Sequence, residues 1–196
     1  MVVNFAIPIK SMTSTATQPR ISYSDYLEWE NARADKNEFV RGEVFAMVGA
    51  RRVHGEVALN CAALLKTHLA GSGCRAYASD MKIRVEAADA VFYPDVFVTC
   101  DARDLATELV FAHPVLVSEV LSESTASYDR GFKFAAYRQL ASLVEYMLID
   151  PDRRSVEVFR RGADGLFTLH DFSASQEVHL ASVEAHLAMA NLFDGV

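Results

Sequence analysis

The sequence predicts an α/β domain whose mixed central sheet is flanked by helices. A long amphipathic segment, residues 54–73, precedes three strand-like runs joined by short loops, which favours antiparallel pairing. A strand–helix–strand unit from Val115 to Ile149 favours a parallel pair within the same sheet. The chain has 196 residues, a length that suits one domain with a full hydrophobic core.

The N-terminal part of the domain is predicted to be a helix followed by a hairpin. Residues 1–20 are interpreted as a tail or arm, and residues 21–196 as the domain. ISYSDYLEWENARADK has apolar residues at helical spacing, with Ser22 or Ser24 placed to cap the helix. NEFVRGEVFAMVG then reads as two short strands about a turn at Arg41-Gly42.

The middle of the chain alternates helices and strands. Segment 54–73 is predicted to be a helix because its apolar residues form one stripe, and Gly71 ends it. The stripe consists of Val57, Cys61, Leu64, Leu65 and Leu69. The other predicted elements are strands at Cys74–Val85, Val91–Cys100, Val115–Leu121, Val144–Ile149, Ser155–Arg160 and Leu166–Asp171, a helix at about Tyr128–Leu140, and extra C-terminal β strands followed by a short helix in VEAHLAMANLF.

Charge and cysteine content restrict the class of protein. The net charge of −7 argues against holding nucleic acid by a broad basic surface, but an acidic enzyme can still meet phosphates through a metal ion. The three cysteines form no CxxC pair, so we expect no disulfide framework and a reduced, cytoplasmic setting. Without a run of 18 apolar residues, no membrane segment is expected.

Two carboxylates interrupt apolar strands. In YPDVFVTC, Asp95 follows a proline suited to a strand start and shares a face with Phe97. In VLVSEVL, Glu119 shares a face with Val117 and Leu121. A buried carboxylate without a partner is costly, so each acid is expected to have a cation beside it.

Lys133 is a candidate for that cation. Asp129, Lys133 and Tyr137 line one stripe of the helix that follows the Glu119 strand. Two carboxylates plus water form a typical Mg²⁺ site, and a neighbouring lysine can stabilise charge on a phosphate. The set Asp95, Glu119 and Lys133 therefore indicates metal-assisted phosphodiester hydrolysis. The alternative is structural: Asp95 caps a turn, and Glu119 and Lys133 form an ion pair.

Three further residues are weaker candidates. Glu43 could add a third carboxylate from the hairpin, His54 stands at a helix start, and Asp80 interrupts a strand run, where it would mark a bulge. The histidines lack the HxxxH or HExxH spacing of zinc sites, and no dinucleotide or P-loop motif is present. A two-carboxylate glycosidase fits less well, because Lys133 and the strand-borne acids suit phosphate chemistry better.

With these motifs the sequence resembles a large bacterial family of uncharacterised, restriction-endonuclease-like proteins in the PD-(D/E)xK nuclease superfamily. The resemblance runs from about Tyr23 to Phe193 and is carried by EFVRGEVFAM, His54, CRAYASDMKIRV, YPDVFVTC, VLVSEVLSESTASYDRGFKFAAYRQL and LVEYMLID. It implies an αβββαβ core, with Asp95 and Glu119 as the metal-binding acids. The superfamily's usual lysine position is Leu121 here, and Lys133 is its relocated replacement.

Two functions of different classes remain open. The first, implied by the resemblance, is a Mg²⁺-dependent endonuclease acting on DNA, with Mn²⁺ as an alternative ion and a homodimer as an option. The second is a binding or scaffold protein that keeps the nuclease fold without catalysis, which the acidic composition and the displaced lysine favour. Metal binding distinguishes the two.

Overall fold

The largest element of the protein is a six-stranded mixed sheet in the order β11-β10-β9-β8-β6-β3. The structure is a computed structural model that describes residues 20–47 and 49–196, so the predicted arm at 1–20 lies outside the described residues except for Arg20. The strands are β3 (Arg75–Ala78), β6 (Val96–Thr99), β8 (Pro114–Val120), β9 (Glu145–Asp150), β10 (Ser155–Arg161) and β11 (Phe167–Asp171). As predicted, the β8–β9 pair is parallel and the other pairs are antiparallel.

A second, five-stranded sheet has the order β2-β1-β5-β4-β7. Its strands are β1 (Asn37–Val40), β2 (Glu43–Ala46), β4 (Lys82–Val85), β5 (Ala90–Phe92) and β7 (Val110–Phe111). The hairpin β1–β2 turns at Arg41 and Gly42, as predicted, and both residues have positive φ (49° and 85°). The short strand β7 was not predicted, because two residues carry no readable period.

Two of the predicted strands are each divided between the two sheets. Cys74–Val85 forms β3 and β4, and Val91–Cys100 lies over β5 and β6, so this ribbon leaves one sheet and enters the other at a corner. Ser79 has φ 57° at the corner, and its N–H donates to the Asp95 carbonyl at 3.1 Å. Asp80 therefore marks this corner, and the bulge expected there is wrong.

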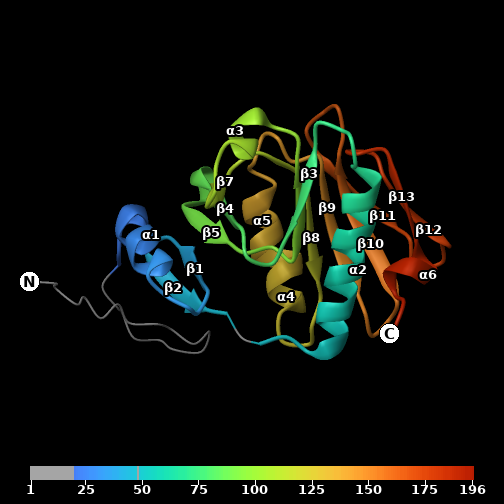
Figure 1. Cartoon of the computed structure of the whole chain (residues 1–196), viewed down its shortest axis with the longest axis horizontal. Coiled ribbons are helices and arrows are strands. Elements are labelled where there is room, and N and C mark those ends of the chain that lie inside the picture. The colour runs from blue at the N-terminus through green and yellow to red at the C-terminus, as the bar shows by residue number, and fades with distance from the viewer. Residues whose placement is uncertain (1–19, 48) are drawn as a thin grey trace, which may run out of the picture.

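Helices cover both faces of the six-stranded sheet (Figure 1). The helical segments are α1 (Tyr23–Asn31), α2 (Arg52–His68), a 3-10 turn (Glu86–Ala88), α3 (Ala102–Leu105), α4 (Ala126–Tyr128), a π-helical turn η2 (Asp129–Lys133), α5 (Phe134–Tyr137) and α6 (Met189–Leu192). Ser22 caps α1, since its side chain accepts from the Asp25 N–H. Among the described residues, no helix has both the length and the apolar character needed to cross a membrane.

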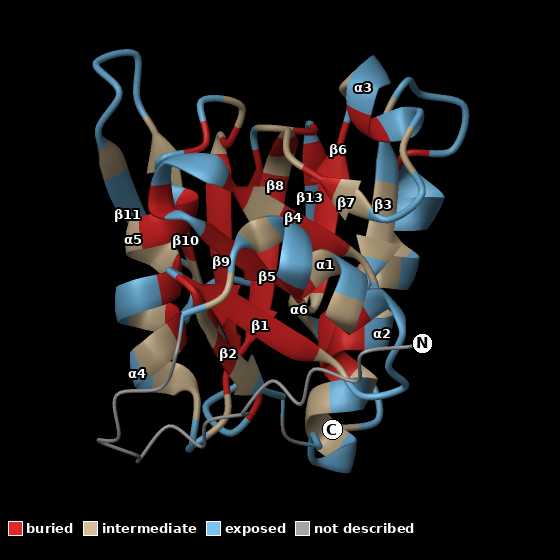
Figure 2. Cartoon of the chain, turned by 90° about the vertical axis from the view of Figure 1, so that its left-hand side faces the viewer, coloured by how far each residue is buried: buried red, intermediate tan, exposed pale blue. Residues whose placement is uncertain are grey.

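Each face of the large sheet has its own hydrophobic core. On one face the predicted stripe of α2 packs on residues such as Val96 and Leu116, together with the C-terminal hairpin. On the other face the continuous helix α4–η2–α5 lies between the two sheets, where Tyr137 contacts Phe92 of β5 and Tyr146 of β9. Figure 2 shows that the buried residues concentrate in the central strands, while α3 and β11 are largely exposed.

The C-terminal prediction is partly wrong. VEAHLAMANLF forms strand β13 (Ala185–Ala188) before the short helix α6, and β13 pairs with β12 (Glu177–Leu180), which was not predicted. The reason is visible in the burial: Val183, Ala185 and Leu187 are buried and alternate with exposed polar residues, which is the period of a strand. The helix α3 was missed as well.

The expectation of no disulfide is also wrong, because Cys74 and Cys100 are bonded and leave Cys61 as the free, buried cysteine among the described residues. Arg75 pairs with Thr99 in the antiparallel β3–β6 ladder, so the two cysteines stand opposite each other just beyond the paired ends. Counting cysteines along the sequence cannot show this register, which arises only when the ribbon folds.

The disulfide gives the first prediction. Cys74 and Cys100 are separated by 26 residues, so reduction should lower the free energy of unfolding by about 3 kcal/mol through the entropy of the unfolded chain. Urea denaturation with and without dithiothreitol measures this. A Cys74→Ser/Cys100→Ser double variant is the control, and its transition should not respond to reductant. Three reactive thiols in wild type that has been oxidised and then denatured without reductant would contradict the bond.

Candidate active site

Glu119 lies in the middle of the site, on an inner strand of the six-stranded sheet. Its strand β8 runs between β6 and β9, and only 2% of the residue is exposed. Strand alternation directs its side chain to the face that carries Val117, Leu121 and the α4–η2–α5 helix. The Glu119 carboxylate is therefore held between the sheet and the helix. In its ionised form it needs a nearby cation or hydrogen-bond donors to offset the loss of water.

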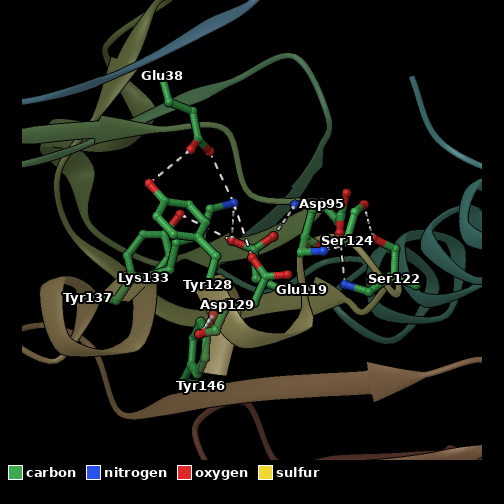
Figure 3. Close-up of polar contacts among 12 residues, drawn as sticks. Glu38, Asp95, Glu119, Ser122, Ser124, Tyr128, Asp129, Lys133, Tyr137 and Tyr146 are labelled. Carbon is green, nitrogen blue, oxygen red and sulfur yellow. Dashed lines mark hydrogen bonds and ion pairs between the residues drawn. The ribbon is translucent and has the colours of Figure 1, made fainter. Parts of the chain in front are cut away.

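Lys133 supplies that compensation from the helix, as the sequence predicts (Figure 3). Its Nζ atom lies 3.2 Å from Glu119 Oε1, 3.0 Å from Glu38 Oε1 and 3.5 Å from Asp129 Oδ1. The lysine is buried, and its ammonium also lies 5.8 Å from the ring centre of Tyr128. One buried cation is thus surrounded by three carboxylates that come from β1, β8 and the helix.

A π-helical turn presents Asp129 and Lys133, the two helix residues of the site. The N–H of Phe134 donates to the carbonyl of Asp129, five residues earlier, so the turn Asp129–Lys133 is wider than an α-helical turn. Tyr146 of β9 fixes this turn, because its hydroxyl donates to the Asp129 carbonyl at 2.9 Å. The Tyr137 hydroxyl donates to Glu119 Oε1 at 3.4 Å.

Asp95 stands next to Glu119 because of the strand register. Val96 pairs with Ser118 in the antiparallel β6–β8 ladder, so Asp95 falls opposite Glu119, and its N–H donates to Glu119 Oε2 at 3.3 Å. The Asp95 carboxylate accepts from the Val120 N–H at 2.8 Å. Its side chain is 19% exposed, so water reaches the site on this side.

His54 joins the site through Asp95. Its Nε2 lies 3.2 Å from Asp95 Oδ2, at the first turn of α2. The hydrogen bond that the His54 ring donates to the Asp95 carboxylate raises the pKa of His54, although burial opposes the shift. Helix α2 covers one face of the six-stranded sheet, and Lys133 lies on the other. His54 contacts Asp95 from the α2 face, and Lys133 contacts Glu119 from the opposite face.

Burial and charge perturb the titration of this cluster. Burial raises the pKa of Glu119 well above its usual range; Lys133 lowers it, and the Asp129, Asp95 and Glu38 carboxylates raise it further. Burial alone would lower the pKa of Lys133, but Glu119 and Glu38 lead the groups that raise it well above its usual value. The carboxyl pKa values of Glu38 and Asp129 are also raised, mainly by burial.

The donor set fits a hard cation such as Mg²⁺. Three carboxylates (Glu38, Glu119 and Asp129) contact Lys133, and the fourth, Asp95, contacts His54, so the available ligand atoms are mainly carboxylate oxygens. In the part of the chain that the structure describes, no group of three or more His, Cys, Asp or Glu residues could hold a metal ion by itself. An ion would therefore use Asp95 and Glu119 and complete its shell with water, as Mg²⁺ usually does.

The other predicted site residues have different positions. Asp80 is exposed at the corner between the sheets, where it pairs with Lys36. Glu43 begins β2, opposite Val40 in the hairpin. Sequence reasoning missed Glu38, because its strand Asn37–Val40 reads NEFV and lacks the long apolar run that marks Glu119, although the structure buries all four residues.

The fold and the site together define a restriction-endonuclease-like protein: carboxylates on neighbouring strands of a mixed sheet, with a lysine from the flanking helix. The chain belongs to the Uma2 family, described as "Putative restriction endonuclease", whose model matches residues 23–190. The family predicted from the sequence motifs is thereby confirmed.

Known relatives extend over almost the whole chain. The uncharacterized protein slr1290 of Synechocystis sp. is 32% identical over 182 residues, covering 93% of this chain and 96% of the relative. A second uncharacterized protein of that organism, sll1609, is 31% identical over 155 residues, covering 78% and 88%. A crystal structure of a putative nuclease belonging to DUF820 from Anabaena variabilis has a TM-score of 0.72 at 17% identity, covering 88% of this chain and 97% of that one, which shows the shared fold.

The raised pKa of Glu119 gives the second prediction. A carboxyl whose folded pKa lies above its usual 4.5 adds stability that is fully present below pH 4.5 and is lost as the pH rises through the folded pKa. Glu119→Gln has no such titration. In buffer with EDTA, the stability of wild type relative to this variant should fall by up to about 1.4 kcal/mol per pH unit over that window.

Urea denaturation of both proteins at a series of pH values measures this difference. Glu38 and Asp129 titrate in both proteins, so the difference reports Glu119 together with its electrostatic coupling to these two carboxyls. A difference that stays constant above pH 4.5 would mean that Glu119 ionises as it does in the unfolded chain.

Proposed function

We propose that this protein is a Mg²⁺-dependent endonuclease that hydrolyses phosphodiester bonds of DNA, with Mn²⁺ as an alternative ion. The observation that carries the proposal is the contact between the buried Lys133 and Glu119, with Asp95 directly beside that carboxylate. Membership of a family described as restriction endonucleases supports the same reaction class. The site offers two oxygen ligands for an ion and one fixed positive charge for a phosphate.

Each residue has a distinct role in the proposed reaction. Asp95 and Glu119 would hold the ion, which supplies Lewis acidity and a water of lowered pKa. His54 and the Val120 N–H orient the Asp95 carboxylate, and Tyr137 orients that of Glu119. Lys133 stabilises the negative charge that develops on the phosphate, and its fixed position limits the reorganisation needed during the reaction.

An inactive scaffold is the second candidate, and one observation favours it. The Lys133 side chain is only 8% exposed and is contacted by three carboxylates, so a phosphate must compete with them for the ammonium. The net charge of −7 also weakens attraction to nucleic acid. In this case the protein would keep the nuclease fold while binding a partner without cleaving it.

The proposal extends to assembly and location. A homodimer would place two sites on the two strands of a DNA duplex, since the symmetry of a dimer matches that of the duplex. We place the protein in the cytoplasm, where DNA is accessible in bacteria. Reductants in that compartment would keep Cys74 and Cys100 as thiols, so the disulfide would belong to the oxidised protein.

Nicking of supercoiled plasmid DNA in Mg²⁺ or Mn²⁺ tests the function, as the third prediction. Asp95→Asn should abolish cleavage and the rise in melting temperature that millimolar Mg²⁺ gives wild type, since one of two ligands is weakened. Lys133→Met should retain the metal-induced rise but cleave about 10²–10³-fold more slowly, the usual loss when one electrostatic stabiliser is removed.

Lys133→Met removes the one cation among residues 20–47 and 49–196 that contacts all three acids, so circular dichroism must first establish that the variant is folded. Lys133→Arg keeps the charge in another shape and serves as the second variant. Lys36→Met is the matched control, because Lys36 pairs with Asp80 at the exposed corner. Wild type that binds metal but leaves every DNA substrate intact would favour the scaffold, and Lys133→Met that cleaves like wild type would remove the lysine from the mechanism.

A further inference from the structure

Glu38 makes the shortest of the three carboxylate contacts to Lys133. The distance from Glu38 Oε1 to Lys133 Nζ is 3.0 Å, and both residues are buried, with exposures of 5% and 7%. Glu38 belongs to β1 in the five-stranded sheet, whereas Glu119 belongs to the six-stranded sheet. The N-terminal hairpin therefore reaches the site from the side opposite Glu119 (Figure 3).

Lys133 is the charged partner of the Glu38 carboxylate. Its Oε1 atom lies 3.0 Å from Lys133 Nζ, and a hydrogen bond from the Tyr93 backbone N–H lowers the pKa of the carboxyl, although burial raises it more. Its Oε2 accepts a long hydrogen bond of 3.5 Å from the Tyr128 hydroxyl. Lys133 therefore supplies the positive charge beside this buried carboxylate, and the donors from Tyr93 and Tyr128 are neutral.

Fold stability alone gives little reason for this charge. All four residues of β1 are buried, and an apolar side chain at position 38 would fill the same space. A buried ion pair is often no more stabilising than apolar residues of similar volume, because both charges must be desolvated. What a charged pair adds is a defined position for the flexible lysine side chain.

Lys133 needs such a fixed partner when the site is in use. Glu119 is shared, since one oxygen faces Lys133 and Tyr137 while the other faces the Asp95 N–H. An ion bound to Glu119 would draw on the same carboxylate. Asp129 lies on the same helix as Lys133, so it cannot fix the ammonium relative to the sheets, whereas Glu38 can.

We propose that Glu38 is a positioning residue that holds the Lys133 ammonium opposite Glu119, so that the N-terminal hairpin completes the hydrolytic site. This inference rests on the proposed nuclease function. Glu38 acts through Lys133 and touches neither the phosphate nor the ion.

The test is a comparison of Glu38→Gln, Glu38→Asp and wild type in DNA nicking, as the fourth prediction. Glu38→Gln keeps the shape but not the charge, so kcat should fall about 10- to 100-fold, in line with the loss from a misplaced catalytic group. KM and the Mg²⁺-induced rise in melting temperature should not change. Glu38→Asp keeps the charge and should retain more kcat than Glu38→Gln.

Glu30→Gln is the matched control for damage to the hairpin. Glu30 is also buried and accepts from the Asn37 N–H at 2.8 Å and the Tyr93 hydroxyl at 2.7 Å, so it supports β1 without contacting Lys133. Its variant should be destabilised yet keep a kcat close to that of wild type. Equal losses in Glu30→Gln and Glu38→Gln would overturn the inference, as would full kcat in Glu38→Gln.

The two proposals fail in different ways. If wild type cleaves DNA and Glu38→Gln cleaves equally well, only the positioning role is overturned. If wild type cleaves no DNA, the nuclease function is overturned and the positioning role with it.

Discussion

The burial of the Lys133 ammonium is the constraint on which the architecture of the site depends. A buried cation must be matched by nearby anions, and here those anions come from β1, β8 and the helix that carries the lysine. These elements belong to two different sheets and the helix between them. The ion pairs therefore specify how the N-terminal hairpin, the large sheet and the helix fit together.

The corner between the two sheets makes this arrangement possible. The ribbon formed by β3–β4 and β5–β6 leaves the six-stranded sheet near Ser79 and Asp95 and continues into the five-stranded sheet. Its β5 strand pairs with β1, which brings Glu38 over the helix. The same corner stops at Asp95, just before β6 begins, and this residue lies beside Glu119. One bend in the chain thus places acids on both sides of Lys133.

The charged residues of the site differ in their access to water. Glu38, Asp129 and Lys133 are enclosed by aromatic rings, including those of Tyr128 and Phe92, whereas Asp95 and His54 are partly exposed. An ion and a substrate would enter at the exposed end, while the enclosed end keeps its charges in a medium of low dielectric. Membership of the Uma2 family supports the nuclease function proposed above, and the likeness to the solved structure concerns the fold alone.

The sequence by itself determined the fold class, the family and the local position of Asp95, Glu119 and Lys133. Strand alternation and helical spacing act over a few residues, so a carboxylate in an apolar strand and a lysine on a helical stripe can be recognised from the chain alone. The parallel crossover between β8 and β9 followed from the intervening helix in the same way.

Only the tertiary structure decided the contacts that depend on register and on chain segments far apart in sequence. Glu38 lies in NEFV and lacked the apolar run that marks Glu119, and its contact with Lys133 required the ribbon to bend and β1 to pair with β5. The Cys74–Cys100 bond depended on the β3–β6 register, and the division of two predicted strands depended on the corner. Periodicity reports which face a residue occupies, but it carries no information about which distant segment packs against that face.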